Sequence, residues 1–159
     1  MKNLKIIVLT LLISTITFGQ RLKESDLPVA VVENFKKAHP QSHVYQWKWK
    51  DKKDRFEAKF IGDNSKYKSY FSADGTWLRT KRDLKKTEVP QEVWKAYSNS
   101  GYADWKIDDI EEIRTPEYPK IYEIEVEKKH KNNFGKTIKE EVYLYFLPSG
   151  ERLDMVKTN

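Results

Sequence analysis

The stretch YQWKWKDKKDRFEAKF, residues 45–60, decides the fold class of this chain of 159 residues. Apolar side chains occupy every second position from Tyr45 to Trp49 and again from Phe56 to Phe60, with polar residues between them. A period of two is typical of a strand that buries one face. Because the polar segment 51–54 separates the two runs, the stretch predicts an antiparallel β-hairpin with one apolar face.

The same pattern can be followed outward from this hairpin. On its N-terminal side, Pro28 can open a helix, because the first helical turn does not need the missing N–H, and Phe35 lies on the apolar stripe of that helix. His39-Pro40 ends the helix, since the residue before a proline avoids the helical region. On the C-terminal side, alternating runs predict two further strands joined by a turn at Asp74-Gly75.

The second half of the chain repeats the spacing of the first. Leu27-Pro28-x-x-Val31-x-x-x-Phe35 is echoed by Val89-Pro90-x-x-Val93-x-x-x-Tyr97, and Phe71-x-x-x-Gly75-x-x-Leu78 by Phe146-x-x-x-Gly150-x-x-Leu153. Alternation predicts strands over 105–114, 120–130, 137–147 and 152–156. We therefore predict an α+β fold of tandem repeats, each with one helix followed by a four-stranded antiparallel sheet, in residues 20–86 and 87–159.

The N-terminal segment 1–19 has the three parts of a secretory signal peptide. Lys2 and Lys5 precede an almost unbroken apolar run over 6–18, and small residues follow it. A buried N-terminal strand or helix is the alternative, but the run has no amphipathic period. We expect cleavage near Gly19-Gln20 and a mature protein, without a transmembrane segment, that is periplasmic or secreted.

Composition and charge restrict the classes of function. The chain contains no cysteine, which excludes cysteine catalysis and cysteine-ligated metals. Residues 27–86 hold 15 basic and 7 acidic side chains, whereas 87–159 hold 11 basic and 15 acidic ones. This split argues against one continuous nucleic-acid surface, and we expect no nucleic acid among the partners. The sequence leaves the oligomeric state open.

No group of residues predicts catalysis, a metal or a cofactor. His39 and His43 have the spacing of helical metal ligands, but Pro40 between them breaks any helix. Ser65-x-x-Lys68 matches a hydrolase pattern that requires a helix start, and here it precedes a strand. The acidic run 108–112 lacks the spacing of a calcium loop. We expect no catalytic residues, no metal and no cofactor.

Several of these motifs carry a resemblance to a known family. Leu27-Pro28-x-x-Val31-x-x-x-Phe35, Trp47, Phe56-Glu57-Ala58-x-Phe60 and Phe71-x-x-Asp74-Gly75-x-Trp77-Leu78 resemble the PepSY-like family of exported Bacteroidetes-type proteins. That family is related in fold to the β-lactamase inhibitor protein. The resemblance implies helix-plus-sheet repeats side by side and a binding or inhibitory role.

Strand parity predicts a working surface. One helix covers one face of each sheet, so side chains of the other parity stay open to a partner. Phe56, Phe60, Phe71 and Leu78 are expected to point inward in the first half, and Phe35 and Trp47 to be buried together there, as are Val93 and Tyr122 in the second half. The predicted partner-binding residues are Arg55, Lys68, Tyr70, Trp77, Arg79, Tyr143 and Tyr145.

The residue types on that surface favour a binding function. Tyrosine, tryptophan and arginine are the usual anchors of protein interfaces. We therefore predict a non-catalytic binding module that recognises a protein or peptide outside the cytoplasm, with inhibition of a peptidase or other hydrolase as one form of this role. The alternative is a structural or envelope-associated surface protein without a single defined target.

Overall fold

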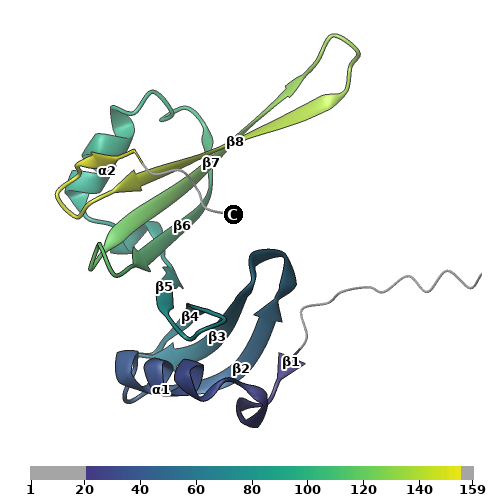
Figure 1. Ribbon diagram of the computed structural model, residues 1–159. Coiled ribbons are helices and arrows are strands. Elements are labelled where there is room, and N and C mark those ends of the chain that lie inside the picture. Colours follow the sequence, from purple (N-terminus) through teal and green to yellow (C-terminus); the bar gives the residue numbers. More distant parts are fainter. Residues whose placement is uncertain (1–20, 155–159) are drawn as a thin grey trace, which may run out of the picture.

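The computed structural model describes residues 21–154, and the signal peptide expected at 1–19 lies outside them. Two α-helices and nine strands, with three single-turn 3-10 helices at 24–26, 51–53 and 86–88, make up this part of the chain (Figure 1). The helices are α1 (Val29–Ala38) and α2 (Gln91–Ser98). The strands are β1 (Arg21–Leu22), β2 (His43–Lys50), β3 (Arg55–Gly62), β4 (Ser65–Ser72), β5 (Trp77–Asp83), β6 (Lys106–Arg114), β7 (Ile121–Lys131), β8 (Thr137–Phe146) and β9 (Arg152–Leu153).

All nine strands form one antiparallel sheet, in the order in which they follow along the chain. The predicted tandem arrangement of two helix-plus-four-strand repeats is therefore wrong. The finding that overturns it is the pairing of β5 with β6, from Thr80 opposite Arg114 to Asp83 opposite Glu111. Two separate sheets would each leave a row of unpaired N–H and C=O groups at this point, and joining them satisfies both rows.

Both helices lie on the same face of this sheet. The register places Ser69, Thr80 and Arg114 side by side across β4, β5 and β6, and residues directly opposite share a face. Helix α1 packs on that face over β2–β4, and α2 over β6–β8. Figure 1 shows the two helices at different heights, with β5 running between the lower and upper parts of the sheet.

Each helix covers its own apolar core. Phe35 and Trp47 are buried together beneath α1 with ring centroids 5.4 Å apart, which confirms their predicted pairing. Val93 and Tyr122 share the core beneath α2, as predicted. The largest fully buried side chains include Phe71 and Phe146, one in each core.

Two glycine turns hold the helices close to the sheet. Gly75 and Gly150 have φ values of +91° and +86°, which glycine adopts without strain. A Cβ at Gly75 would lie 2.8 Å from Ala30 of α1, and one at Gly150 would lie 2.6 Å from the carbonyl oxygen of Glu92 in α2. Both positions therefore need glycine for its conformation and for its small size.

The described part of the chain contains no helix long and apolar enough to span a membrane.

Candidate functional site

The sheet face opposite the two helices is the candidate site, and we call it the open face. The strand register shows which residues belong to the open face. Glu57, Tyr70 and Arg79 lie side by side across β3, β4 and β5, and Lys81 continues this face toward Ile113 of β6. No helix among residues 21–154 packs on this face.

According to the strand register, six of the seven predicted partner-binding residues lie on the open face. They are Arg55, Lys68, Tyr70, Arg79, Tyr143 and Tyr145. Trp77 does not, because it packs against the core beneath α1 and its indole Nε1 donates a hydrogen bond to Thr80 Oγ1 at 3.1 Å. Its predicted outward orientation is therefore wrong.

A β-bulge explains the different orientation of Trp77. Tyr70 pairs with Arg79, but the next residue, Phe71, pairs with Trp77, so Leu78 is an extra residue in β5. One extra residue reverses the parity of everything before it. Leu78, which was predicted to point inward, is accordingly 37% exposed.

Two of the three tyrosines predicted to bind a partner are already covered by their neighbours. Tyr70 is 7% exposed and Tyr145 is 4% exposed, although both belong to the open face. Tyr145 packs with Ile113 and Ile121 in a small apolar cluster on this side of the sheet. Burial and the nearby Glu123 raise the pKa of Tyr145. Since a covered ring adds little contact area, the side chains around it offer more surface to a partner.

A buried ion network crosses the junction of β5, β6 and β7 on the open face. Lys81 forms ion pairs with Glu111 and with Glu123, the latter at 3.3 Å, and all three residues are at most 8% exposed. Burial raises the pKa of Glu111, and the charge of Lys81 acts in the opposite direction. We call Lys81, Glu111 and Glu123 the seam network. It was not identified from the sequence, although opposite charges near 81 and 111 were visible there.

Carboxylates beside the seam network do not form a metal centre on their own. Oxygens of Asp83, Asp109 and Glu111 lie within 4.8 Å of one another. However, the ammonium group of Lys68 lies 3.3 Å from Asp83, and Lys81 pairs with Glu111. Two lysines thus already supply the positive charge that a cation would bring, and we assign no metal to this cluster.

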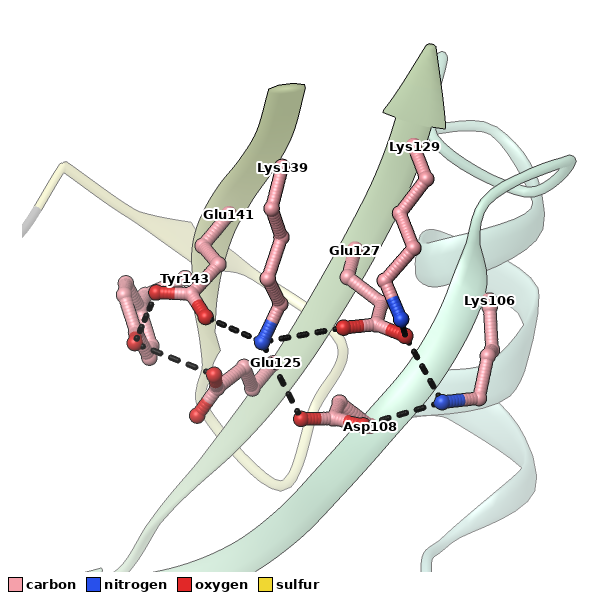
Figure 2. A network of polar contacts seen from close by, with 8 residues as sticks. All are labelled: Lys106, Asp108, Glu125, Glu127, Lys129, Lys139, Glu141 and Tyr143. Atoms are coloured by element: carbon pink, nitrogen blue, oxygen red, sulfur yellow. Dashed lines mark hydrogen bonds and ion pairs between the residues drawn. The ribbon is translucent and has the colours of Figure 1, made fainter. Parts of the chain in front are cut away.

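A second ion network surrounds Glu127 at the base of the β7–β8 hairpin (Figure 2). Lys106, Lys139 and Lys129 lie 2.7, 2.9 and 3.4 Å from its carboxylate oxygens. Hydrogen bonds from these lysines, Lys106 first, lower the pKa of Glu127 to about 2. Tyr143 donates a hydrogen bond to the neighbouring Glu125 at 3.1 Å. The acidic side chains of this region are therefore largely neutralised within the molecule.

The tip of the same hairpin presents the most exposed large apolar side chain among the described residues. Phe134 is 93% exposed, in a turn where Asn132 Oδ1 accepts hydrogen bonds from the N–H groups of Phe134 and Lys136. Residues beyond Glu127 in β7 have no partner in β6, so the hairpin projects past the rest of the sheet (Figure 1). An aromatic residue beside a glycine in a polar turn is the sequence signal that could have identified this position.

The helix side of the sheet holds a small polar pocket of about 180 Å³. In it, His39 Nε2 lies 3.2 Å from Ser69 Oγ and 3.3 Å from Thr80 Oγ1. Both hydroxyl residues are almost fully buried, so this arrangement does not expose a nucleophile to solvent. Burial, with a contribution from Arg114, lowers the pKa of His39 to about 4. His39 is therefore neutral at pH 7.

We expect acidification to destabilise the protein through His39. The folded-state pKa of about 4 lies below the ordinary value of 6.5, so the unfolded chain binds a proton more readily between these values. Stability from this group is present above pH 6.5 and falls as the pH drops toward 4. Allowing for partial exposure, the free energy of unfolding should decrease by about 2 kcal/mol over this window.

Urea unfolding at a series of pH values measures this decrease. His39→Gln should flatten the pH dependence in this window, whereas His43→Gln, at an exposed strand position, should retain it. An unchanged pH dependence in His39→Gln would show that other groups are responsible.

The fold and the open face define a class of protein, a small α+β protein with one sheet and a helix-free face. Residues 54–151 match the family described as "Putative beta-lactamase-inhibitor-like, PepSY-like". The chain belongs to this family, as its motifs predicted. No curated protein matches the chain.

Solved structures from Bacteroides species share the fold. A DUF2874 family protein from Bacteroides ovatus ATCC 8483 has a TM-score of 0.64 and 24% sequence identity, over 80% of this chain and 85% of that one. A BLIP-like protein from Bacteroides fragilis NCTC 9343 has a TM-score of 0.62 and 26% identity, over 80% and 83%. A protein from Bacteroides eggerthii DSM 20697, described as "putative periplasmic", has a TM-score of 0.57 and 24% identity, over 80% and 86%.

Proposed function

We propose that the protein is a non-catalytic binding module that recognises a protein or peptide outside the cytoplasm. The observation that carries this proposal is the open face, where aromatic and charged side chains line a sheet surface that neither helix covers. Side chains of these types dominate the energetics of protein interfaces. The inhibitor-like description of the family and the BLIP-like protein of Bacteroides fragilis support a hydrolase or peptidase as the target.

Two observations support action in the periplasm or after secretion. The first is the signal-peptide pattern in residues 1–19. The second is the periplasmic description of the Bacteroides eggerthii protein, which has the same fold.

The side chains that a partner would touch are those that cover the buried tyrosines. Arg55, Arg79 and Tyr143 are half-buried and belong to the open face, so each retains surface for a partner to contact. The charge of the arginines can also accelerate the approach of an oppositely charged partner.

Site-specific photocrosslinking in envelope preparations tests the proposal. A photoreactive amino acid at position 143 should give one discrete adduct with a second protein. The same group at Lys37, which is exposed on α1, should give none. A third variant, with the group at Phe134, tests whether the hairpin tip also contacts the partner.

Three outcomes would count against this proposal. A discrete adduct from position 37 alone would place the interface on the helix side of the sheet. An adduct from position 134 alone would place it at the hairpin tip. A ladder of adducts of the protein with itself would favour the structural, envelope-associated alternative.

A further inference from the structure

Two arginines of the open face lie against the same tyrosine ring. Arg55 Cζ is 4.4 Å from the centre of the Tyr70 ring and Arg79 Cζ is 5.3 Å from it. The register accounts for this, because Arg79 lies directly opposite Tyr70 and Arg55 lies diagonally across from it, next to Glu57 along one face of β3. We call Arg55, Tyr70 and Arg79 the arginine–tyrosine cluster. Stacking on the ring restricts both guanidinium groups before any partner arrives.

Neither guanidinium group is in direct contact with a carboxylate of the described part of the chain, although the nearby charge of Glu57 acts on Arg55. Neither forms an ion pair with a carboxylate of residues 21–154, and the Nε atom of Arg55 is buried without a hydrogen-bond partner. Burial and the positive charge of Arg79 lower the pKa of Arg55. The adjacent carboxylate of Glu57 lies instead 3.6 Å from Lys50 and 4.0 Å from Lys59. Two guanidinium groups are thus held close together without a carboxylate in direct contact with either, and the one acid beside them is shared with two lysines.

The acidic half of the open face is arranged in the opposite way. Glu127 contacts three lysines, Glu123 contacts Lys81, and Glu125 accepts a hydrogen bond from Tyr143. Carboxylates that are already paired gain little from an external cation. Among the described residues of the open face, Glu123 and Glu127 are thus already engaged by lysines, whereas Arg55 and Arg79 are not engaged by a carboxylate.

We infer that the arginine–tyrosine cluster is the docking point for an aspartate or glutamate side chain on the surface of the bound protein. A carboxylate accepts paired hydrogen bonds from the planar guanidinium fork, and two such forks lie here against one ring. The inference rests on the proposed function, because a protein partner carries its negative charge as carboxylates. It adds the chemistry of the partner: an acidic patch opposite β3–β5.

Two matched peptides test the cluster without knowledge of the natural partner. One is a capped eight-residue peptide with two glutamates, and its twin has glutamine in their places. The probe of binding is the NMR signal of the Nε–H groups of Arg55 and Arg79 during titration with each peptide. We expect the glutamate peptide to shift both signals, with an effect that weakens as salt is added, and the glutamine twin to leave them in place.

Variants separate this cluster from general positive charge. Arg55→Gln and Arg79→Gln should each weaken binding of the glutamate peptide by about tenfold or more, because each removes a charge-assisted pair. Lys48→Gln removes one positive charge from the same face of β2 and should change binding less than about twofold. Thermal unfolding confirms that each variant is folded.

The opposing results are distinct. Equal shifts with both peptides, or an equal loss in Lys48→Gln, would overturn the inference. Binding of inorganic phosphate without binding of the glutamate peptide would also overturn it, and would assign the cluster to phosphate esters. A crosslinked partner at position 143 with no glutamate binding would refute only this inference. Glutamate binding without any crosslinked partner would refute only the proposed function.

Discussion

Replacing Lys81 with methionine is expected to lower the free energy of unfolding by about 3–5 kcal/mol. Lys81 stands between Glu111 and Glu123, and each of the three is at most 8% exposed. Without the ammonium group, two buried carboxylates face each other with no counter-charge, which is far costlier than the loss of a surface pair. Urea unfolding monitored by tryptophan fluorescence measures the effect.

Two further variants show whether the buried charges cause that loss. Lys68→Met removes a lysine whose partner, Asp83, is exposed, so it should cost less than about 1 kcal/mol. Combining Lys81→Met with Glu111→Gln and Glu123→Gln removes the unpaired charges and should restore part of the lost stability. If Lys81→Met and Lys68→Met cost the same, the seam network has no special role in stability.

Phe35→Ala is expected to destabilise the protein by about 3–5 kcal/mol, because it leaves a cavity beneath α1. Phe35 is 3% exposed, and its ring centroid lies 5.2 Å from that of Phe60 and 5.4 Å from that of Trp47. Close packing around an aromatic ring allows little collapse when the ring is removed. The midpoint of urea unfolding should therefore move to a much lower concentration.

Val29→Ala is the matched control for this substitution. Val29 belongs to the same helix but is 71% exposed, so its truncation should change stability by less than about 0.5 kcal/mol. A small effect of Phe35→Ala, similar to that of Val29→Ala, would contradict the burial described here.

The sequence allowed the local elements to be predicted. Period-two runs marked β2 and β3 closely, and the Pro28 and Pro90 signals marked the starts of α1 and α2. These signals are strong because they arise from local geometry: side-chain alternation in strands and the missing N–H of proline. The pairing of Phe35 with Trp47 followed from the apolar stripe of the helix together with the alternation of the strand.

The joining of the sheet could not be predicted in this way. Strands β5 and β6 pair across an intervening helix, with Lys81 opposite Ile113, and no local rule links segments so far apart. The similar spacing before Gly75 and Gly150 suggested two modules, yet it reflects a shared local need, a glycine turn that touches a helix. Complementary charge at 81 and 111 was the one hint of the long-range pairing.

The sequence predicted only part of the candidate site, again because side-chain alternation is a local rule. Alternation assigned Arg55, Tyr70 and Arg79 to one face, and the register agrees. It assigned Trp77 wrongly because a single bulged residue reverses parity and leaves no clear mark in the sequence. It also could not show that Tyr70 is covered by its arginine neighbours, since burial on an exposed sheet face depends on the rotamers of long side chains.

The pairing of β5 with β6 has a consequence for biosynthesis. The chain is made from its N-terminus, so β5 is complete before β6 exists, and until then its outer edge has no partner. An unpaired edge can bind the equivalent edge of another nascent molecule. The basic side chains of β5, Arg79, Lys81 and Arg82, make such an encounter repulsive, since two copies would bring like charges together. We therefore expect the lysine that later binds Glu111 and Glu123 also to disfavour aggregation of the half-made sheet.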